Sequence, residues 1–277
     1  MSDGIRPLVP EDLPDCLDLA QDRAWSREEH KWRFLFELGT VYGQRDATGR
    51  LVGTTILTRY GPDVAAISMV LVATSHGRRG LGRALMEHAL AEAGEAVVFL
   101  NATEYGRPLY ERLGFRAVGG TVVHVGHFDI RPSSDPVSRP FRAADLPAVR
   151  ALDAEVVGAD RTRLVRRLPD FAEQVRVIER HGTITGYAGA WRNVDNVLVG
   201  PVVAATADDA RTLIADTAAR VDGPVRLDLD DRHPELREWA TRHGVPVRGR
   251  TDVMVRGADE LPGDRDRWFV PVMQALG

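Results

Sequence analysis

The stretch that decides the fold is VATSHGRRGLGRAL, residues 72–85, in which an apolar strand end runs through a basic, glycine-rich loop into a helix. Glycines at positions 80 and 82 let the backbone approach a ligand closely and turn several N–H groups inward. The helix that follows adds unpaired N–H groups and the positive end of its dipole. Arginines 78, 79 and 83 surround the turn. The stretch therefore predicts a binding site for a diphosphate.

Composition limits what kind of protein this is. The 277 residues are 44% hydrophobic, enough for one large domain or two ordinary ones. The net charge of −4 argues against bulk nucleic-acid binding and is compatible with a small cationic substrate. No apolar run approaches the roughly 18 residues of a membrane-spanning helix, and the first residues do not resemble a signal peptide. We expect a cytoplasmic protein that binds neither nucleic acid nor membrane.

Cysteine and histidine give no sign of a metal site. Cys16 is the only cysteine and lies among leucines, which favours a small core residue over a reactive thiol. His124 and His127 are three residues apart on a predicted strand, so they face opposite sides. We therefore expect no metal and no disulfide.

The chain repeats itself at an offset of 133 residues, a relation that chance would supply once but not twice without a slip. The matching segments are Arg6-Pro7 with Arg139-Pro140, Asp12-Leu13-Pro14 with Asp145-Leu146-Pro147, and GRLVG (49–53) with GTITG (182–186). The seam between the copies is a Pro/Ser-rich linker, residues 131–138. The sequence thus predicts a first domain over residues 1–130 and a second over 139–277.

Each copy shows the same order of elements. A short strand (5–9, 138–142) precedes helices and a strand pair, a long apolar strand (64–73, 195–204) precedes a helix, and a further strand (96–101, 224–229) precedes another helix and closing strands. Mixed helices and strands in this order predict an α/β (α+β) fold, with a central, mostly antiparallel mixed sheet flanked by helices in each copy.

The two copies differ at the glycine-rich loop. Aligning LVAT (71–74) with VAAT (203–206) places Thr212 and Ile214 where the first copy has its two loop glycines. The second copy instead begins its helix with ADDA (207–210), whose two acids would repel a diphosphate. The sequence predicts that the first copy kept a phosphate site and that the second lost it.

Two elements together resemble a known family. The loop pattern V-x₅-R-x-G-L-G-x-A-L is followed, at the usual separation, by Asn101 and then LYERLGF (109–115), an arrangement similar to that of the GCN5-related N-acetyltransferases (GNAT). The resemblance covers residues 1–128, and the second half resembles the same fold more distantly. The whole chain resembles tandem GNAT proteins with a degenerate C-terminal copy. One departure is that Gly77 stands where the family loop usually begins with glutamine or arginine, with Arg78 and Arg79 beside it.

The resemblance implies that acetyl-CoA is the co-substrate and that no metal takes part. Backbone N–H groups of residues 78–84 would hold the diphosphate, and the strand before them would pair with the pantetheine arm as if the arm were an added strand. Asn101, at a strand end, would contact the same arm or simply cap the strand. The residues assigned to cofactor binding are Val70, Leu71, Val72, Arg78, Arg79, Gly80, Leu81, Gly82, Arg83, Ala84 and Asn101.

Tyr110 is the predicted general acid. Its phenol is protonated at neutral pH and can donate to a departing thiolate. It opens a helix-end pattern in which Gly114 is the C-cap and Phe115 the apolar anchor, so a half-buried structural tyrosine is the alternative. In the repeat, Gly114 aligns with Gly244 and Tyr110 falls on Ala240, so the second copy lacks this tyrosine as well.

The general base is harder to assign. Family members often place a glutamate on the strand before the loop, but residues 67–70 (ISMV) contain no carboxylate. Glu104 is the first candidate, with a solvated loop acid as the alternative. A second set lies in the segment that lines the acceptor pocket in the family fold, although an ordinary exposed helix face or a water chain would also explain it. Its members are Trp25, Glu28, Glu29 and His30.

The expected activity is transfer of acetyl from acetyl-CoA to the primary amine of a small molecule, by direct attack in a ternary complex. The second copy would close the acceptor pocket or form the surface of a homodimer. Two alternatives stay open at this point: acetylation of a protein lysine or N-terminus, and a non-catalytic acyl-CoA sensor. Asp228, Asp230 and Asp231 could bind a cationic acceptor, or form a solvated strand end.

Overall fold

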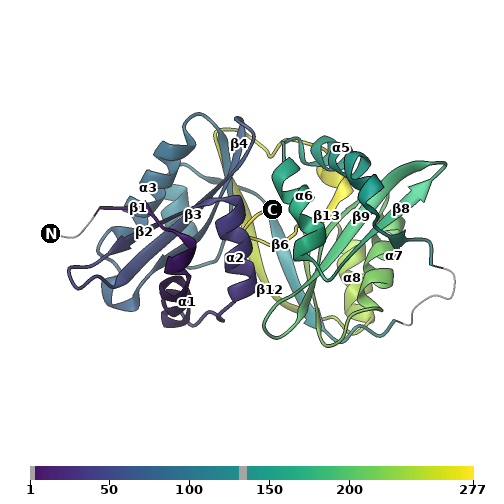
Figure 1. Ribbon diagram of the computed structural model, residues 1–277, viewed down its shortest axis with the longest axis horizontal. Coiled ribbons are helices and arrows are strands. Elements are labelled where there is room, and N and C mark those ends of the chain that lie inside the picture. The colour runs from purple at the N-terminus through teal and green to yellow at the C-terminus, as the bar shows by residue number, and fades with distance from the viewer. Residues whose placement is uncertain (1–3, 131–135) are drawn as a thin grey trace. The chain divides into compact units, whose positions relative to one another are not determined.

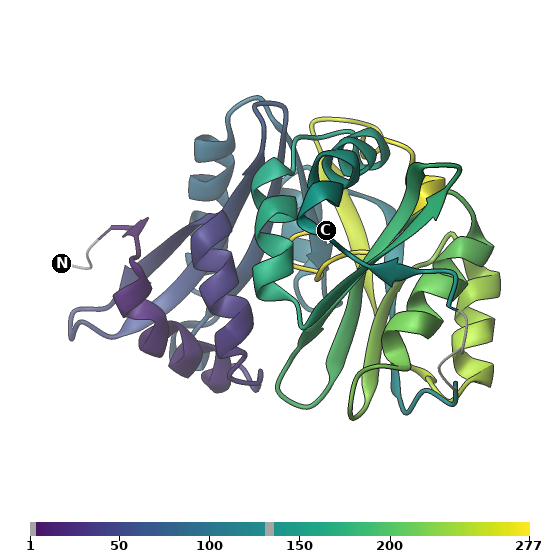
Figure 2. The ribbon, with the colours of Figure 1, turned by 45° about the vertical axis from the view of Figure 1, so that its right-hand side comes forward.

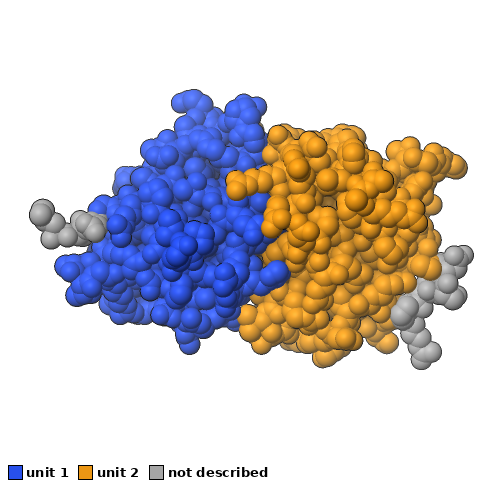
Figure 3. Space-filling view, viewed as in Figure 1, with its two compact units in different colours: residues 1–100 blue, residues 101–277 orange. Residues whose placement is uncertain are grey.

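The computed structural model describes residues 4–130 and 136–277. By internal contacts the chain divides into unit 1, residues 1–100, and unit 2, residues 101–277, which are coloured separately in Figure 3. Each unit is described by itself. The predicted linker falls largely on residues 131–135, outside the described residues, and the predicted domain boundary stays a prediction.

Unit 1 is built on a mostly antiparallel sheet in the order β1-β2-β3-β4-β5. Only the β4–β5 pair is parallel, because α3 crosses over between them. The strands are β1 (Arg6–Pro7), β2 (Thr40–Arg45), β3 (Leu51–Tyr60), β4 (Val64–Val72) and β5 (Val97–Ala102), the last of which crosses the boundary between the units.

Helices cover both faces of this sheet (Figure 1). α1 (Leu13–Asp22) and α2 (Glu29–Leu38) lie on one face, and α3 (Leu81–Ala93) lies on the other. The approach of α3 is close: a Cβ added to Gly53 of β3 would lie 2.9 Å from a Leu85 methyl group. Glycine at this position therefore lets the helix that follows the loop pack directly on the sheet.

Unit 2 contains a second mostly antiparallel sheet in the order β12-β6-β11-β10-β9-β8-β7, with β13 paired to β10. Here too one pair, β10–β11, is parallel. The strands are β6 (Arg116–Gly126), β7 (Arg139–Pro140), β8 (Gln174–Arg180), β9 (Thr183–Arg192), β10 (Val197–Ala204), β11 (Val225–Asp230), β12 (Val247–Arg256) and β13 (Trp268–Val270).

The position of β6 is the feature of unit 2 that the repeat does not suggest. In the chain, β6 closes the first copy, yet it lies between β11 and β12 of the second copy and pairs antiparallel with both. Thr121 of β6 faces Asp230 on one side and Thr251 on the other. A strand of the first copy is thus an internal strand of the second copy's sheet.

The helices of unit 2 again form two layers (Figure 2). α5 (Leu146–Val157) and α6 (Thr162–Phe171) lie on one face of the sheet, and α7 (Ala207–Ala218) and α8 (Pro234–Arg242) lie on the other. A short helix, α4 (Arg107–Arg112), precedes β6. The remaining elements are 3₁₀ turns: η1 (Pro10–Asp12) and η2 (Thr74–His76) in unit 1, and η3 (Ala143–Asp145) and η4 (Arg265–Arg267) in unit 2.

Equivalent hydrogen bonds confirm the repeat. The carboxylate of Asp12 accepts from Val9 N–H at 2.9 Å, and 133 residues later the carboxylate of Asp145 accepts from Arg142 N–H at 2.7 Å. At the end of the long apolar strand, Ala73 N–H donates to the Val52 carbonyl at 2.9 Å, as Ala205 N–H does to Thr185 at 3.0 Å. The predicted fold class, with two copies of one helix-flanked sheet, is confirmed.

Unit 2 also contains a buried ion pair. Arg161 and Asp153 have side chains that are 0% and 1% exposed, and they are joined by two hydrogen bonds of 2.6 and 3.1 Å. The Asp153 carboxylate also accepts from the Tyr187 hydroxyl, and Arg161 donates to the Gly277 carbonyl at 2.8 Å. The guanidinium of Arg161 lies 5.1 Å from the ring centroid of Trp268. Two helices, a strand and the last residues of unit 2 are therefore joined through one buried charge pair.

Candidate active site

The edge of β4 opens toward its carboxyl end. Pairing with β5 stops at Ala66–Phe99, although β4 continues to Val72. The register with β3 shifts just beyond this point, where Met69 has a left-handed φ of +50° and its carbonyl accepts a 2.9 Å hydrogen bond from Thr54 Oγ1. A bulged, non-glycine residue held in this way stores local strain, which is common at functional sites. Within unit 1, the β5-facing backbone of residues 70–72 has no strand partner.

The glycine-rich loop begins directly after this edge. Arg78 and Gly80 have left-handed φ values of +60° and +84°, and α3 starts at Leu81. The space beside Gly80 is open, since a Cβ added there would meet no atom within 4 Å. Within the described residues no side chain caps α3, so its first N–H groups face outward unpaired. These are the properties of an anion site at a helix N-terminus.

The predicted loop residues are accessible. Exposed residues are Arg78, Arg79, Gly80, Arg83 and Ala84, and half-buried ones are Leu81 and Gly82. Arg83 pairs with Glu87 at 2.8 Å across one helical turn, an exposed pair that leaves its guanidinium on the surface near the loop. Val70 and Val72 are half-buried and Leu71 is buried. Their roles in cofactor binding stay predictions.

The same place in the second copy is filled by the protein's own side chains. Thr206 caps α7 by accepting from Asp209 N–H at 3.1 Å, and the Asp209 carboxylate pairs with Arg180 at 2.5 Å. Asp208 adds a second carboxylate to the first turn. Acidic groups at a helix N-terminus satisfy its dipole and repel a further anion. The helix end that is open in the first copy is thus capped and negatively charged in the second.

Tyr110 lies on α4 with its ring packed against glycine. A Cβ added to Gly106 would lie 2.9 Å from the tyrosine ring and 3.2 Å from its hydroxyl oxygen, and the Phe115 ring meets it at 6.2 Å in an edge contact. Burial raises the pKa of Tyr110 to about 12. The phenol is therefore neutral, with its proton in place, across the physiological range.

The helix end after Tyr110 follows the predicted pattern in both copies. Gly114 has φ +85°, and Phe115 N–H returns to the Tyr110 carbonyl at 3.0 Å. In the second copy Gly244 has the same φ, and Val245 N–H returns to the Ala240 carbonyl at 3.0 Å. The two helix ends match, but the phenol is present only in the first.

The side chain of Asn101 is occupied within unit 2. Its amide donates to the Gln274 carbonyl at 2.8 Å, and its oxygen accepts from Thr121 and Thr251 at 3.1 and 3.3 Å. This arrangement is more than the simple strand cap that was the alternative. A contact with the cofactor stays a prediction, and these bonds leave the side chain little capacity for one.

The candidate bases lie in different elements. Glu104 is exposed in the loop between β5 and α4. Glu28 is half-buried, with its carboxylate 2.5 Å from Lys31, whereas Glu29 makes an exposed pair with Arg33. Trp25 is 39% exposed, and His30 is exposed as well. Glu28 is the one carboxylate of this set that is partly withdrawn from water, but no geometry selects a base among them.

Cys16 is a core residue. Its side chain is 0% exposed on α1, and burial, reinforced by Asp12 and Asp15, raises its pKa to about 12. A thiol in this state is neither a nucleophile nor a thiolate ligand at neutral pH.

We therefore expect the native protein to react negligibly with a thiol-specific disulfide reagent at pH 8, and to release one equivalent after denaturation. Cys16 is the only cysteine, so the count is unambiguous. Rapid reaction of the folded protein would contradict the burial of this thiol and would reopen an acyl-enzyme route.

The acidic group near the end of β11 is neutralised by arginine. Asp228 pairs with Arg226 and Asp231 with Arg250, each within 2.9 Å, and Asp230 pairs with Arg232 and Arg265 at 3.1 Å. These carboxylates serve ion pairs, which argues against a cationic acceptor there. Over residues 4–130 and 136–277, no group of three acidic, His or Cys side chains is arranged to hold a metal, and no helix is both long and apolar enough to cross a bilayer.

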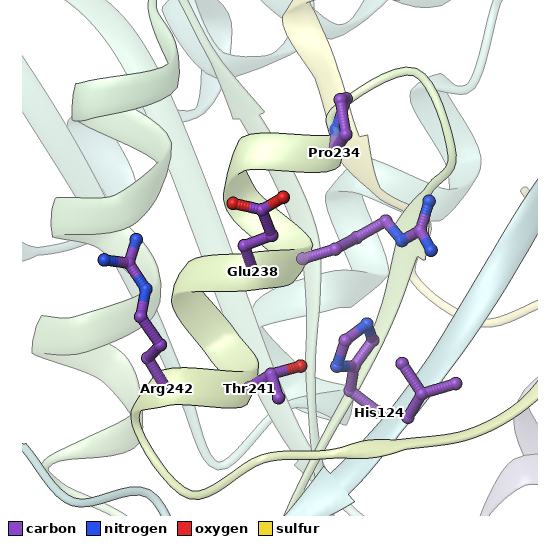
Figure 4. A pocket seen from close by; sticks show the side chains of 7 residues that line it. His124, Pro234, Glu238, Thr241 and Arg242 are labelled. Atoms are coloured by element: carbon purple, nitrogen blue, oxygen red, sulfur yellow. The ribbon is translucent and has the colours of Figure 1, made fainter.

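A cavity of about 370 Å³ lies on the outer side of α8 in unit 2 (Figure 4). Its walls come mainly from α8, with one residue from β6 and one from β12. The lining residues are His124, Pro234, Arg237, Glu238, Thr241, Arg242 and Val247. α8 is the counterpart of the Tyr110 helix in the copy without loop glycines, so we do not assign this cavity to the cofactor.

Comparison with known families gives the class of this fold. The model described as "Acetyltransferase (GNAT) family" matches residues 7–115, and "Acetyltransferase (GNAT) domain" matches residues 149–270. The chain belongs to the GNAT family of acyltransferases and carries the domain twice. Members of this family use acetyl-CoA as co-substrate.

Relatives match along the whole chain. An uncharacterized N-acetyltransferase of Bacillus subtilis (strain 168), YitH, is 27% identical over 99% of both chains. The crystal structure of a putative acetyltransferase from Pyrococcus horikoshii has a TM-score of 0.83 at 18% identity, covering 99% of this chain and 95% of that one. A tandem GNAT protein from the clavulanic acid biosynthesis pathway has a TM-score of 0.66 at 16% identity, covering 94% and 100%. The structural matches establish the fold that these proteins share.

Proposed function

We propose that this protein transfers the acetyl group of acetyl-CoA to the primary amine of a small molecule, and that the first copy alone performs the reaction. The observation that carries the proposal is the open β4 edge followed by the uncapped, glycine-led N-terminus of α3. An extended arm can pair with such an edge, and a diphosphate can accept from such a helix end. The second copy has a capped, acidic helix end in place of the second feature.

The reaction would proceed by direct attack. The amine nitrogen forms a bond to the thioester carbonyl carbon, and the carbon–sulfur bond then breaks. A backbone N–H of the β4 edge, near Val70, would stabilise the oxyanion. The ammonium proton of the acceptor passes to Glu104, to Glu28 or its neighbours, or to water. Tyr110 donates a hydrogen bond to the leaving sulfur. The burial of Cys16 supports a route without an acyl-enzyme.

Thiol release from acetyl-CoA across a panel of amines tests this proposal. The panel contains small primary amines, lysine-bearing peptides and peptides with free N-termini. Release with small amines would support the proposal, and release with peptides alone would move the acceptor to a protein. Tight binding of acetyl-CoA with no release across the panel would favour a sensor instead.

The loop glycine offers a matched pair of variants. We expect Gly80→Ala to weaken acetyl-CoA binding at least several-fold, because an L-residue at φ +84° costs about 1–2 kcal/mol and its Cβ enters the cradle. Gly49→Ala is the control: Gly49 has φ +85° and equally open surroundings, but it lies in the β2–β3 hairpin. Calorimetric titration with acetyl-CoA should separate the two. Equal affinities would remove the cradle from the site.

A further inference from the structure

Asp22, the last residue of α1, is bonded to the turn that leads into the cradle. Its carboxylate accepts from Thr74 N–H at 2.6 Å, and its own carbonyl accepts from the Thr74 hydroxyl at 3.1 Å. The next residue, Arg23, donates to the same hydroxyl at 3.2 Å. Three hydrogen bonds thus join the end of one helix to a single residue of η2.

Thr74 is where the backbone leaves the sheet. Ala73 N–H is still held by the Val52 carbonyl of β3, and the next N–H in the chain is the one that Asp22 binds. From there His76 N–H returns to Ala73 at 2.8 Å and Gly77 N–H to Thr74 at 3.3 Å. The path of the chain into Gly80 therefore depends on a contact with α1, beyond the reach of the sheet.

Charge keeps this contact in its bonded form. The hydrogen bond from Thr74 N–H, together with nearby Arg50 and Arg23, lowers the pKa of Asp22. Its side chain is 23% exposed, and the Arg50 guanidinium lies 3.8 Å away. An ionised acceptor makes a stronger bond to a backbone N–H than a neutral one.

The second copy serves as an internal comparison. At the offset of the repeat, Asp22 corresponds to Glu155 and Thr74 to Thr206. Glu155 pairs with Arg267 instead, and the Thr206 side chain caps α7. The preceding backbone bond is the same in both copies, so the difference begins at this residue. The contact with the first helix is made in the copy that has an open helix end.

We propose that Asp22 is a positioning residue that holds the Thr74–Gly80 turn in the conformation that binds the diphosphate. The inference rests on the proposed function for its ligand, acetyl-CoA. A loop that is competent only part of the time binds more weakly in proportion to that fraction. Releasing Thr74 should therefore weaken acetyl-CoA binding and leave the chemistry of the bound complex unchanged.

Two variants and a control test this. Asp22→Ala removes the acceptor for Thr74 N–H, whereas Asp22→Asn keeps an oxygen in the same place. Asp160→Ala is the control, because Asp160 likewise accepts from a backbone N–H, that of Thr162 at 2.9 Å, but at the start of α6. We expect Asp22→Ala to raise the acetyl-CoA dissociation constant about tenfold, the size of one lost charge-assisted hydrogen bond. Asp22→Asn should recover most of that loss, and Asp160→Ala should bind as wild type does.

Two readouts separate this inference from the proposed function. Hydrogen exchange in the unliganded protein should quicken at Thr74 and Gly77 in Asp22→Ala but not in the control, whatever the ligand is. Turnover at saturating acetyl-CoA should match wild type. If wild type fails to bind acetyl-CoA, the proposed function is wrong and hydrogen exchange still decides the tether. Unchanged exchange at Thr74, or wild-type affinity in Asp22→Ala, would overturn the positioning role.

Discussion

Replacing Asp153 with alanine should destabilise unit 2 by about 3–5 kcal/mol, the usual cost of leaving a buried charge without its partner. Arg161 would keep its charge at 0% exposure while losing both hydrogen bonds to the carboxylate. The Tyr187 hydroxyl would lose its acceptor as well. The Gly277 carbonyl and the Trp268 ring would remain beside the guanidinium, and neither carries a compensating charge.

Guanidinium denaturation followed by tryptophan fluorescence measures this effect, since Trp268 lies beside the pair. Asp170→Ala is a matched control: Asp170 pairs with Arg167 at 2.9 Å, but the two side chains are 68% and 46% exposed. That loss should stay below about 1 kcal/mol. If Asp153→Ala is too unstable to purify, combining it with Arg161→Met should restore part of the stability, because no unpaired charge remains. A loss below about 1 kcal/mol for Asp153→Ala would show that water reaches the arginine.

Local signals in the sequence predicted the fold and the loop well. Gly80 and Gly114 mark backbone conformations that other residues rarely adopt, and both have the left-handed φ that their positions required. The repeat doubled the evidence for every element, because a pattern seen at two places 133 residues apart must satisfy the same packing twice. The order of strands and helices in each copy was confirmed for that reason.

Long-range pairing was out of reach. Nothing in residues 116–126 indicates which strands will flank them, because the same alternation would suit an edge strand or an internal one. The structure places β6 between β11 and β12. The partners of Asn101 likewise come from residues 20 to 173 positions away. Asp153 and Arg161 read as ordinary polar residues near helix ends, and only tertiary packing buries them.

The base stays unassigned for a related reason. A carboxylate acts as a base when its surroundings raise its proton affinity or place it against the substrate, and neither property is written in the spacing of the chain. Glu104 and Glu28 differ in burial, which only the structure could reveal. The tyrosine was easier to find, because its helix-end pattern returns in the second copy with alanine in its place.

Replacing Tyr110 with phenylalanine should lower turnover at least tenfold and leave acetyl-CoA affinity nearly unchanged. General acid catalysis contributes roughly 10²–10⁴-fold in enzymes, so tenfold is the smallest loss compatible with the role. Phenylalanine keeps the ring packed against Gly106 and Phe115 and removes only the hydroxyl. A lower kcat with an unchanged dissociation constant is the signature of an interaction made in the transition state.

The raised pKa of Tyr110 sets the pH dependence. With its pKa near 12, the phenol keeps its proton well above the ordinary value of 10, so Tyr110 should cause no fall in kcat between pH 7 and 10. Its contribution to stability has the same sign: it is fully present below pH 10 and is lost as the pH rises toward 12. A thiol has a pKa of roughly 8–9, so full transfer from this phenol to a free thiolate is uphill. The hydrogen bond therefore acts while the carbon–sulfur bond is breaking.

Tyr105→Phe is the matched control for Tyr110→Phe. Tyr105 lies five residues earlier in the same loop and helix segment but is 79% exposed, so its hydroxyl has no place in a buried proton transfer. Steady-state kinetics of both variants from pH 7 to 10, with acetyl-CoA binding measured by calorimetry, should show a loss of kcat in Tyr110→Phe alone. Wild-type turnover in that variant would remove the general-acid role, and an equal loss in both would assign the effect to the segment as a whole. A kcat of wild type that falls with an apparent pKa below 10, and does so only when Tyr110 is present, would mean that substrate binding lowers the pKa of the phenol toward that of the thiol it serves.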